Sequence, residues 1–230
     1  MLFRSGEPYS LLTYAETVRE FVDVLDCGPV LLGGLSLGGG ITLQMALTHP
    51  EKLVGIIPLD AWGLFEHLPW HRLINWYVHT KLNKHIFSWS ARYPWIIRQM
   101  LATNLIGDRR AVTPALLDEV LASMRVPGGG EPFRSFLMHE IRKDGLTTRV
   151  FDRLHELSLP TLLVQGSRDT AIPLRGVQEA QQRIPGARLH VMQGCRHWPQ
   201  KERPEEFAAV TANFAAEVFC FSSAQHLERQ

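Results

Sequence analysis

The chain has 230 residues, with 24 lysine and arginine residues against 23 aspartate and glutamate residues, for a formal net charge of +1. This length fits one larger α/β domain or two small ones, and 45% hydrophobic with 20% charged residues argues against wholesale disorder. The near-neutral charge offers nothing to attract nucleic acid, and the apolar stretches are too short to span a bilayer. We therefore expect neither nucleic acid nor a membrane as a partner.

The cysteine content indicates the redox environment of the protein. The three cysteines are an odd number and include no C-x-x-C pair: Cys27, Cys195 and Cys220. This pattern argues against a disulfide scaffold and a thiolate zinc site, and we expect no metal site. A reducing, cytoplasmic location fits best, and the opening residues MLFRSGEP lack the charged-then-apolar order of a secretory signal.

The first part of the chain alternates helices and strands. Apolar residues at helical spacing predict a helix over about Tyr14–Asp26, where Thr13 and Glu16 have capping-box spacing. A short buried strand, a helix and an all-apolar strand follow at Val30–Gly33, Leu37–Thr48 and Leu53–Leu59. Strands that are apolar on both faces are typical of a parallel sheet covered by helices on both sides.

The alternation stops in the middle of the chain and resumes near its end. Residues 61–159 contain no convincing strand and hold five of the six tryptophans, which predicts a helical insertion with these rings mostly in its core. Two more strands follow, at Thr161–Gln165 and Arg188–Met192. Two more helices follow, at Leu174–Ile184 and Glu205–Phe219. We therefore predict a parallel sheet with right-handed crossovers, formed by residues 1–60 and 160–230 around the insertion.

A G-x-S-x-G pattern, GLSLG at residues 34–38, lies between a predicted strand and a predicted helix. A sharp strand-to-helix turn pushes the side chain of Ser36 out of the sheet, where a base and a carbonyl carbon can reach it. Glycines two residues before and after the serine relieve crowding in this turn. The following helix points N–H groups at the site, so we expect the Leu37 N–H to stabilise an oxyanion. The alternative, a turn that cradles phosphate, lacks the lysine of the P-loop pattern.

A serine nucleophile needs a base, and the base needs an orienting carboxylate. Asp169 follows the third predicted strand directly, and His197 follows the fourth. Both positions are strand carboxyl ends, where the sites of parallel sheets lie. Asp60 ends the second strand and is the rival acid; the strand-loop-helix setting favours Asp169. The alternative for Asp169 is a residue that caps a helix, and the alternative for His197 is a surface loop histidine.

These motifs resemble those of the α/β-hydrolase superfamily, in the esterase-like group with a helical cap. The matching stretches are GLSLGG at 34–39, GSRDTAIP at 166–173 and GCRHWPQKERPEEF at 194–207, and the order serine, acid, histidine is that of the superfamily. The resemblance implies an α/β fold with a doubly wound, mostly parallel sheet and a helical cap. It also implies Ser36 as nucleophile, His197 as general base and Asp169 as orienting acid.

The resemblance further implies hydrolysis of a small or medium apolar carboxylic ester through an acyl-enzyme, without a cofactor. Carbon–carbon bond hydrolysis and perhydrolysis use the same three residues and remain alternatives. Because tryptophans are dense in the insertion, we expect an aromatic-lined substrate pocket that includes Trp62 and Trp198.

One departure from the family concerns the start of the chain. In the family, several strands and a helix precede the nucleophile, whereas here only 35 residues precede Ser36. We expect Met1 to be an internal methionine of a longer gene. The alternatives are a partner chain that completes the sheet and a decayed hydrolase. In the chain as given, the first strand is an open sheet edge, through which we expect self-association. A non-catalytic pseudohydrolase or ligand-binding protein is the alternative from another functional class.

Overall fold

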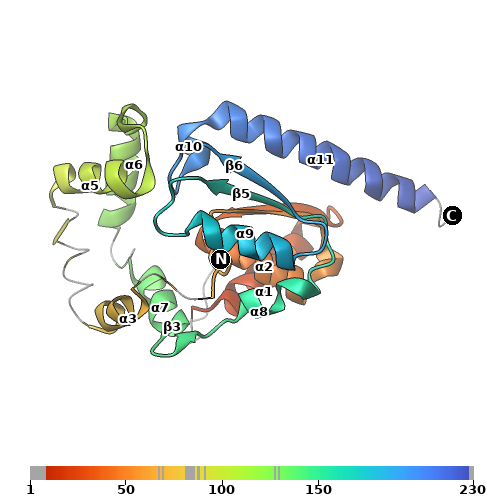
Figure 1. Cartoon of the computed structure of the whole chain (residues 1–230), viewed down its shortest axis with the longest axis horizontal. Coiled ribbons are helices and arrows are strands. Elements are labelled where there is room, and N and C mark those ends of the chain that lie inside the picture. The colour runs from red at the N-terminus through yellow and green to blue at the C-terminus, as the bar shows by residue number, and fades with distance from the viewer. Residues whose placement is uncertain are drawn as a thin grey trace.

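Four parallel strands form the centre of the molecule (Figure 1). The computed structural model describes residues 9–66, 68, 70–80, 86, 89, 90, 92–126, 128 and 130–227, with side chains as far as residue 220. The core elements of the first part are α1 (Leu11–Leu25), β1 (Val30–Leu35), α2 (Leu37–Thr48) and β2 (Leu53–Leu59). Those of the last part are β5 (Leu162–Gly166), α9 (Leu174–Arg183), β6 (Arg188–Met192), α10 (Pro199–Glu202) and α11 (Pro204–Leu227).

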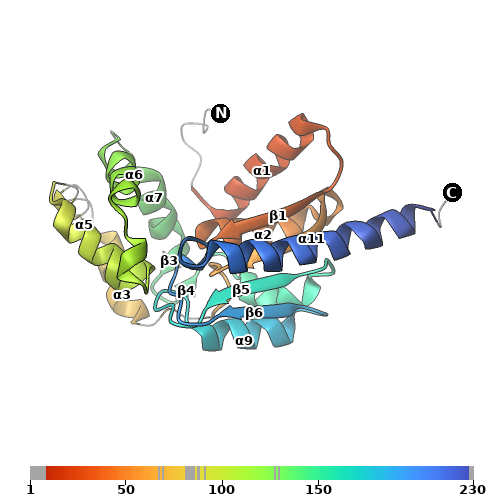
Figure 2. The same ribbon diagram turned by 90° about the horizontal axis from the view of Figure 1, so that it is seen from above.

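The strand order in the sheet is β1-β2-β5-β6, and all neighbouring strands are parallel. Helix α11 covers one face of the sheet, where Phe214 and Val218 pack against apolar side chains of β2 and β5. Helices α1, α2 and α9 lie on the other face (Figures 1 and 2). Because the strands run in the same direction, their carboxyl ends meet at one edge, and the loops that leave this edge converge there. The predicted α/β class and parallel sheet are confirmed.

Most predicted core elements are confirmed, several of them with the predicted bounds. Helix α2 and strands β2 and β6 begin and end where the pattern predicts. The assignment of Thr13 as the first helix's cap is wrong, because Ser10 is the capping residue and its Oγ accepts a hydrogen bond from the Thr13 N–H at 3.1 Å. The helix begins at Leu11, whose fully buried side chain requires an earlier first turn than the periodicity indicated.

The segment over residues 61–159, called the cap below, is mainly helical. Its helices are α3 (His71–His79), α5 (Pro94–Met100), α6 (Pro114–Arg125), α7 (Glu131–Glu140) and α8 (Val150–Arg153). The prediction that it contains no strand is wrong, because β3 (Ile141–Arg142) and β4 (Gly145–Leu146) form an antiparallel hairpin. Each strand has two residues, which is too short for hydrophobic alternation to reveal.

The prediction that the cap tryptophans form its core is also wrong. Trp62 is buried, whereas four others are exposed: Trp70, Trp76, Trp89 and Trp95. The outer part of the cap instead packs around aliphatic side chains of α5, α6 and the segment between them, including Ile97, Leu101 and Leu116. A high density of indole rings therefore did not indicate where the rings pack.

Strand β1 ends the sheet on one side. It pairs with β2, and the described residues place no strand on its other side. Self-association through this edge stays a prediction, which light scattering can check. Over the helices that the structure describes, none combines the length and the apolar character needed to cross a bilayer.

Candidate active site

Ser36 occupies a strained turn between β1 and α2. Its backbone has φ 54° and ψ −114°, an unfavourable conformation for a residue with a side chain. The turn is tight because a Cβ atom at Gly34 would overlap the Gly38 backbone, and one at Gly39 would overlap Ala61. A Cβ at Gly38 would meet nothing within 4 Å, so the prediction that this glycine relieves its own crowding is wrong. Its backbone is instead what excludes a side chain at Gly34.

The backbone of Ser36 is held from the neighbouring strand. Its N–H donates to the Leu59 carbonyl at 2.9 Å, and its carbonyl accepts from the Trp62 N–H at 2.9 Å. Leu37 is the first residue of α2, so its N–H has no acceptor within the helix. This N–H is therefore available to an anionic atom at the end of the sheet.

The acid and histidine loops meet at the carboxyl ends of β5 and β6. His197 Nδ1 lies 2.7 Å from Asp169 Oδ2, and both residues are buried. The other carboxylate oxygen, Oδ1, accepts hydrogen bonds from the N–H groups of Ala171 and Ile172, at 2.7 and 3.1 Å. Three donors thus hold Asp169 in one orientation against the imidazole.

Electrostatics keeps Asp169 ionised. Burial by itself would raise the pKa of this carboxyl, but the hydrogen bond from His197 and its positive charge lower it, and hydrogen bonds from Asp60 and the Ile172 N–H act the same way. The net effect is a pKa below the ordinary value. A buried anion beside an imidazole stabilises the imidazolium that forms when the histidine accepts a proton.

Backbone contacts lock the two loops together. The Arg168 N–H donates to the Cys195 carbonyl at 2.8 Å, and a Cβ atom at Gly166 would overlap the Arg196 carbonyl. A side chain at Gly166 would therefore push apart the loops that carry Asp169 and His197. Burial raises the pKa of the Cys195 thiol to about 11, which leaves this neighbour of the histidine uncharged.

The four predicted residues lie at one edge of the sheet, each after the end of a different strand. Ser36 follows β1, Asp60 follows β2, Asp169 lies beyond β5, and His197 lies beyond β6. The Ser36 hydroxyl makes no hydrogen bond with a described residue. Such contacts are commonly long without substrate and tighten in the bound state.

The two tryptophans expected in a substrate pocket have different surroundings. The Trp62 ring is buried and makes edge contacts with Phe65 and Phe136, at centroid distances of 5.3 and 5.5 Å. Trp198 is half-buried and packs against the apolar side chains of the outer cap, and its backbone N–H donates to the Leu105 carbonyl at 2.9 Å. Trp62 thus lies under the nucleophile turn, and Trp198 joins the histidine loop to the cap.

Sequence reasoning missed Glu202, at the end of α10. One carboxylate oxygen accepts from the N–H groups of Gly107 and Asp108 in the cap, at 2.8 and 3.1 Å, and the other accepts from Arg196 N–H at 2.7 Å. The side chain therefore connects the cap directly to the residue before His197. No sequence signal could have identified it, because two of its three partners lie more than 90 residues away.

The side chains of Asp60, Asp169 and His197 are close enough to be considered as metal ligands, since one ligand atom from each lies within 4.8 Å of the others. The Asp169–His197 hydrogen bond already uses two of these groups, and an ion would have to break it. A cavity of about 290 Å³ lies elsewhere, between Phe65, the β3–β4 hairpin and Phe151. Ser36, Asp169 and His197 do not line it.

Known proteins resemble this chain over most of its length. The sequence model described as "Alpha/beta hydrolase family" matches residues 3–210. The 2-hydroxymuconate semialdehyde hydrolase of Pseudomonas putida is 29% identical over 210 residues, covering 89% of this chain and 69% of that protein. The 2-hydroxy-6-oxo-6-phenylhexa-2,4-dienoate hydrolase of Comamonas testosteroni is 28% identical, covering 88% and 68%. The chain spans 61% to 69% of the length of these and other curated relatives that it matches.

Solved structures share the fold at lower identity. A meta-cleavage product hydrolase from Pseudomonas fluorescens matches with a TM-score of 0.71 at 22% identity, covering 93% of this chain and 74% of that one. A thermophilic esterase from Thermogutta terrifontis matches with a TM-score of 0.68 at 20% identity, covering 91% and 73%. The same fold therefore accompanies two kinds of hydrolase in these neighbours.

Proposed function

The chain belongs to the alpha/beta hydrolase family, and from this premise we propose that it is a serine hydrolase that cleaves a carboxylic ester or a related acyl bond through an acyl-enzyme. One observation carries the proposal. The 2.7 Å hydrogen bond between His197 Nδ1 and Asp169 Oδ2 is buried at the edge of the sheet where Ser36 has its strained backbone. A serine, an imidazole and an oriented carboxylate at one edge are the parts that nucleophilic acyl transfer requires.

In this mechanism, Ser36 Oγ attacks the carbonyl carbon of the substrate while His197 Nε2 accepts the hydroxyl proton. Asp169 accepts a hydrogen bond from Nδ1–H, which leaves Nε2 free to act as the base. The Leu37 N–H donates to the oxygen that becomes negatively charged. Collapse of the tetrahedral intermediate transfers the proton from His197 to the leaving alcohol. Water then attacks the acyl carbon while His197 accepts its proton. His197 returns this proton to Ser36 Oγ as the bond between Oγ and the acyl carbon breaks and the acid is released.

Hydrolysis of a carbon–carbon bond is the second candidate, and the comparisons specifically favour it. Two of the relatives described above are named for 2-hydroxymuconate semialdehyde and for 2-hydroxy-6-oxo-6-phenylhexa-2,4-dienoate. The same three residues would serve, with a carbon leaving group in place of an alcohol oxygen.

Labelling by a fluorophosphonate probe tests the shared part of both candidates. We expect the full chain to be labelled at Ser36, and Ser36→Ala to abolish the label. Ser123→Ala, which removes an exposed serine on α6, is the matched control and should label like wild type. A folded wild-type chain that is not labelled would favour the non-catalytic alternative.

A substrate panel separates the two candidates. Purified chain is offered p-nitrophenyl esters of increasing acyl length and, in parallel, 2-hydroxy-6-oxo-6-phenylhexa-2,4-dienoate. The ester proposal requires ester turnover that Ser36→Ala removes. A kcat/KM at least tenfold higher on the dienoate, with the same dependence on Ser36, would assign the chain to carbon–carbon hydrolysis.

A further inference from the structure

Asp60 is a fully buried carboxyl group that the mechanism above does not use. It follows the last residue of β2, and its N–H donates to the Val164 carbonyl at 2.9 Å. Its Oδ1 accepts a hydrogen bond from the Gly166 N–H at 3.0 Å, at the start of the acid loop. Its backbone has φ 40°, a left-handed conformation that aspartate tolerates better than most residues. The side chain thus reaches across from β2 to the loop that carries Asp169.

The second carboxyl oxygen of Asp60 lacks a donor. Oδ2 is buried, and no described group donates a hydrogen bond to it. Asp60, Asp169 and His197 each have a side-chain oxygen or nitrogen within 4.8 Å of those of the other two. A carboxylate oxygen without a donor is costly in the interior, and two adjacent buried carboxylates repel each other. A carboxylic acid with its proton on Oδ2 avoids both costs, because Asp169 then becomes its acceptor.

The distribution of hydrogen-bond donors decides which of the two groups carries the proton. Asp169 accepts from two backbone N–H groups and from His197, whereas Asp60 accepts from one backbone N–H. Glu202 is a further negative group that disfavours a second anion here. Burial, the hydrogen bond to Asp169 and the negative charge of Asp169 raise the pKa of Asp60 to about 10, whereas the pKa of Asp169 is lowered.

We propose that Asp60 is a positioning residue whose carboxyl group stays protonated and donates a hydrogen bond from Oδ2 to the Asp169 carboxylate. The inference rests on the proposed function, in which Asp169 orients His197. The hydrogen bond restrains Asp169 in addition to the acid loop's own N–H donors. It also withdraws part of the negative charge that faces the imidazole, and it leaves the carboxyl pair with a single negative charge.

Infrared spectroscopy tests the proton without any need for activity. At pH 7, we expect the spectrum of the full chain to contain the carbonyl band of a protonated carboxyl group, and Asp60→Asn to remove it. Glu140→Gln is the matched control, because the carboxyl group of Glu140 is also buried, and this variant should keep the band. A wild-type spectrum with no carboxylic acid band that depends on Asp60 would overturn the proposal.

Kinetics test the positioning role through a conservative and a non-conservative variant. In Asp60→Asn, the amide can accept from Gly166 and donate to Asp169, so we expect kcat within a fewfold of wild type. Asp60→Leu cannot donate, so we expect kcat to fall on the order of 10- to 100-fold. The acid limb of its pH profile should move to higher pH, because Asp169 then keeps its full charge and stabilises the imidazolium more strongly. A shape change alone would not move this limb.

The outcomes separate this proposal from the proposed function. If Asp60→Asn loses as much activity as Asp169→Asn, Asp60 acts as an ionised acid and the proposal fails. If Asp60→Leu keeps wild-type kcat and pH profile, there is no positioning role. If Asp60→Leu does not fold, Asp60→Asn and the infrared band still decide. If the wild-type chain turns over no substrate, the proposed function fails. The infrared spectrum alone then tests whether the carboxyl group of Asp60 is protonated.

Discussion

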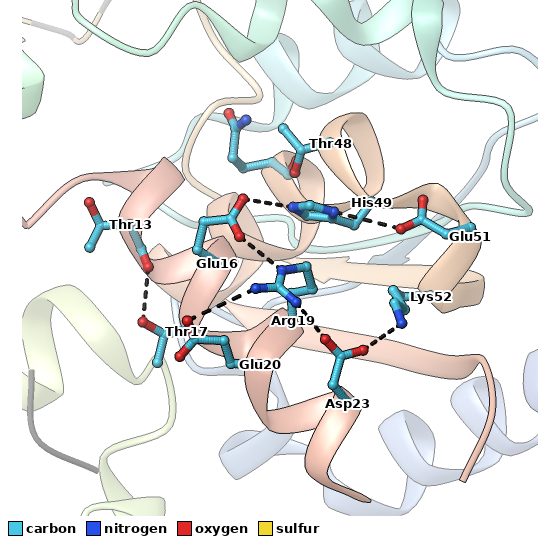
Figure 3. Close-up of polar contacts among 11 residues, drawn as sticks. Thr13, Glu16, Thr17, Arg19, Glu20, Asp23, Thr48, His49, Glu51 and Lys52 are labelled. Carbon is cyan, nitrogen blue, oxygen red and sulfur yellow. Dashed lines mark hydrogen bonds and ion pairs between the residues drawn. The ribbon is translucent and has the colours of Figure 1, made fainter. Parts of the chain in front are cut away.

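Two regions of this molecule contain a histidine paired with a carboxylate at the same distance. His197 Nδ1 lies 2.7 Å from Asp169 Oδ2 at the carboxyl edge of the sheet, and His49 Nε2 lies 2.7 Å from Glu16 Oε1 at the junction of α1 and α2 (Figure 3). The side chains of the first pair are 8% and 0% exposed, whereas those of the second are 20% and 42% exposed. Equal distances therefore occur in very different dielectric surroundings.

The neighbours of the two pairs differ as much as their burial. The exposed pair belongs to a network of opposite charges, with Arg19 bonded to Glu16 and Asp23, and Lys52 bonded to Asp23 (Figure 3). The buried pair has another acid, Asp60, as its neighbour. Water and countercharges screen the first pair. In the second pair, by the proposal above, a proton keeps the neighbouring acid neutral. The comparison teaches that burial, and not bond length, separates a candidate site from a surface ion pair.

Removing each histidine is the strongest test of this contrast. We expect His197→Ala to lower kcat on the order of 10⁴- to 10⁶-fold, because the general base is lost. His49→Ala should leave kcat within about twofold, since surface substitutions away from a site have small effects. Steady-state ester hydrolysis measures both, with thermal melting to verify folding. Comparable losses in the two variants would abolish the functional distinction between the regions.

Neutralising each carboxylate is the next test. Asp169→Asn keeps the shape but lets the side chain stabilise the wrong imidazole tautomer, so we expect kcat to fall on the order of 10⁴-fold. Glu16→Gln should not change kcat. Pre-steady-state acylation with a p-nitrophenyl ester isolates the step concerned. Normal acylation by Asp169→Asn would mean that another group orients His197.

Glu202 tests whether the cap supports the buried region. Glu202→Ala leaves three backbone N–H groups without their acceptor, so we expect the free energy of unfolding to fall by about 1–3 kcal/mol. Its exposed neighbour Lys201 is the control, and Lys201→Ala should cost about 0–0.5 kcal/mol. Urea denaturation measures both changes. Equal effects would show that the cap and the histidine loop are not joined through this carboxylate.

The smallest effect is expected in the exposed network. The hydrogen bonds from Arg19 and His49 lower the pKa of Glu16, so its stabilisation is present above its unfolded pKa of about 4 and is lost as the pH falls through the lower folded value. Because Glu16 is exposed and screened, we expect Glu16→Gln to cost only about 0–1 kcal/mol at pH 7. Denaturant titrations should show this difference vanish at acid pH and in 1 M salt. A difference that survives high salt would contradict the exposed character of the pair.

Much of the core could be predicted from local patterns. Apolar runs and glycine punctuation located β2, α2 and β6, and the crowding between Gly34 and Gly38 is a short-range steric fact. The order of Ser36, Asp169 and His197 with respect to the strands was enough to expect them at one edge, because parallel strands bring their carboxyl ends together. The cap was harder, since its hairpin strands are two residues long and its exposed indole rings resemble core residues in composition.

The sequence by itself determined the parallel α/β core, the nucleophile turn and the main residues of the candidate site. These depend on local periodicity, glycine sterics and strand direction. Only the tertiary structure decided that the carboxyl group of Asp60 contacts the end of β5, 106 residues away, that Glu202 joins the cap to the histidine loop, and that one histidine–carboxylate pair is buried and the other exposed. Hydrogen-bond partners and solvent exposure are properties of groups distant in the chain, and they exist only once the chain has folded.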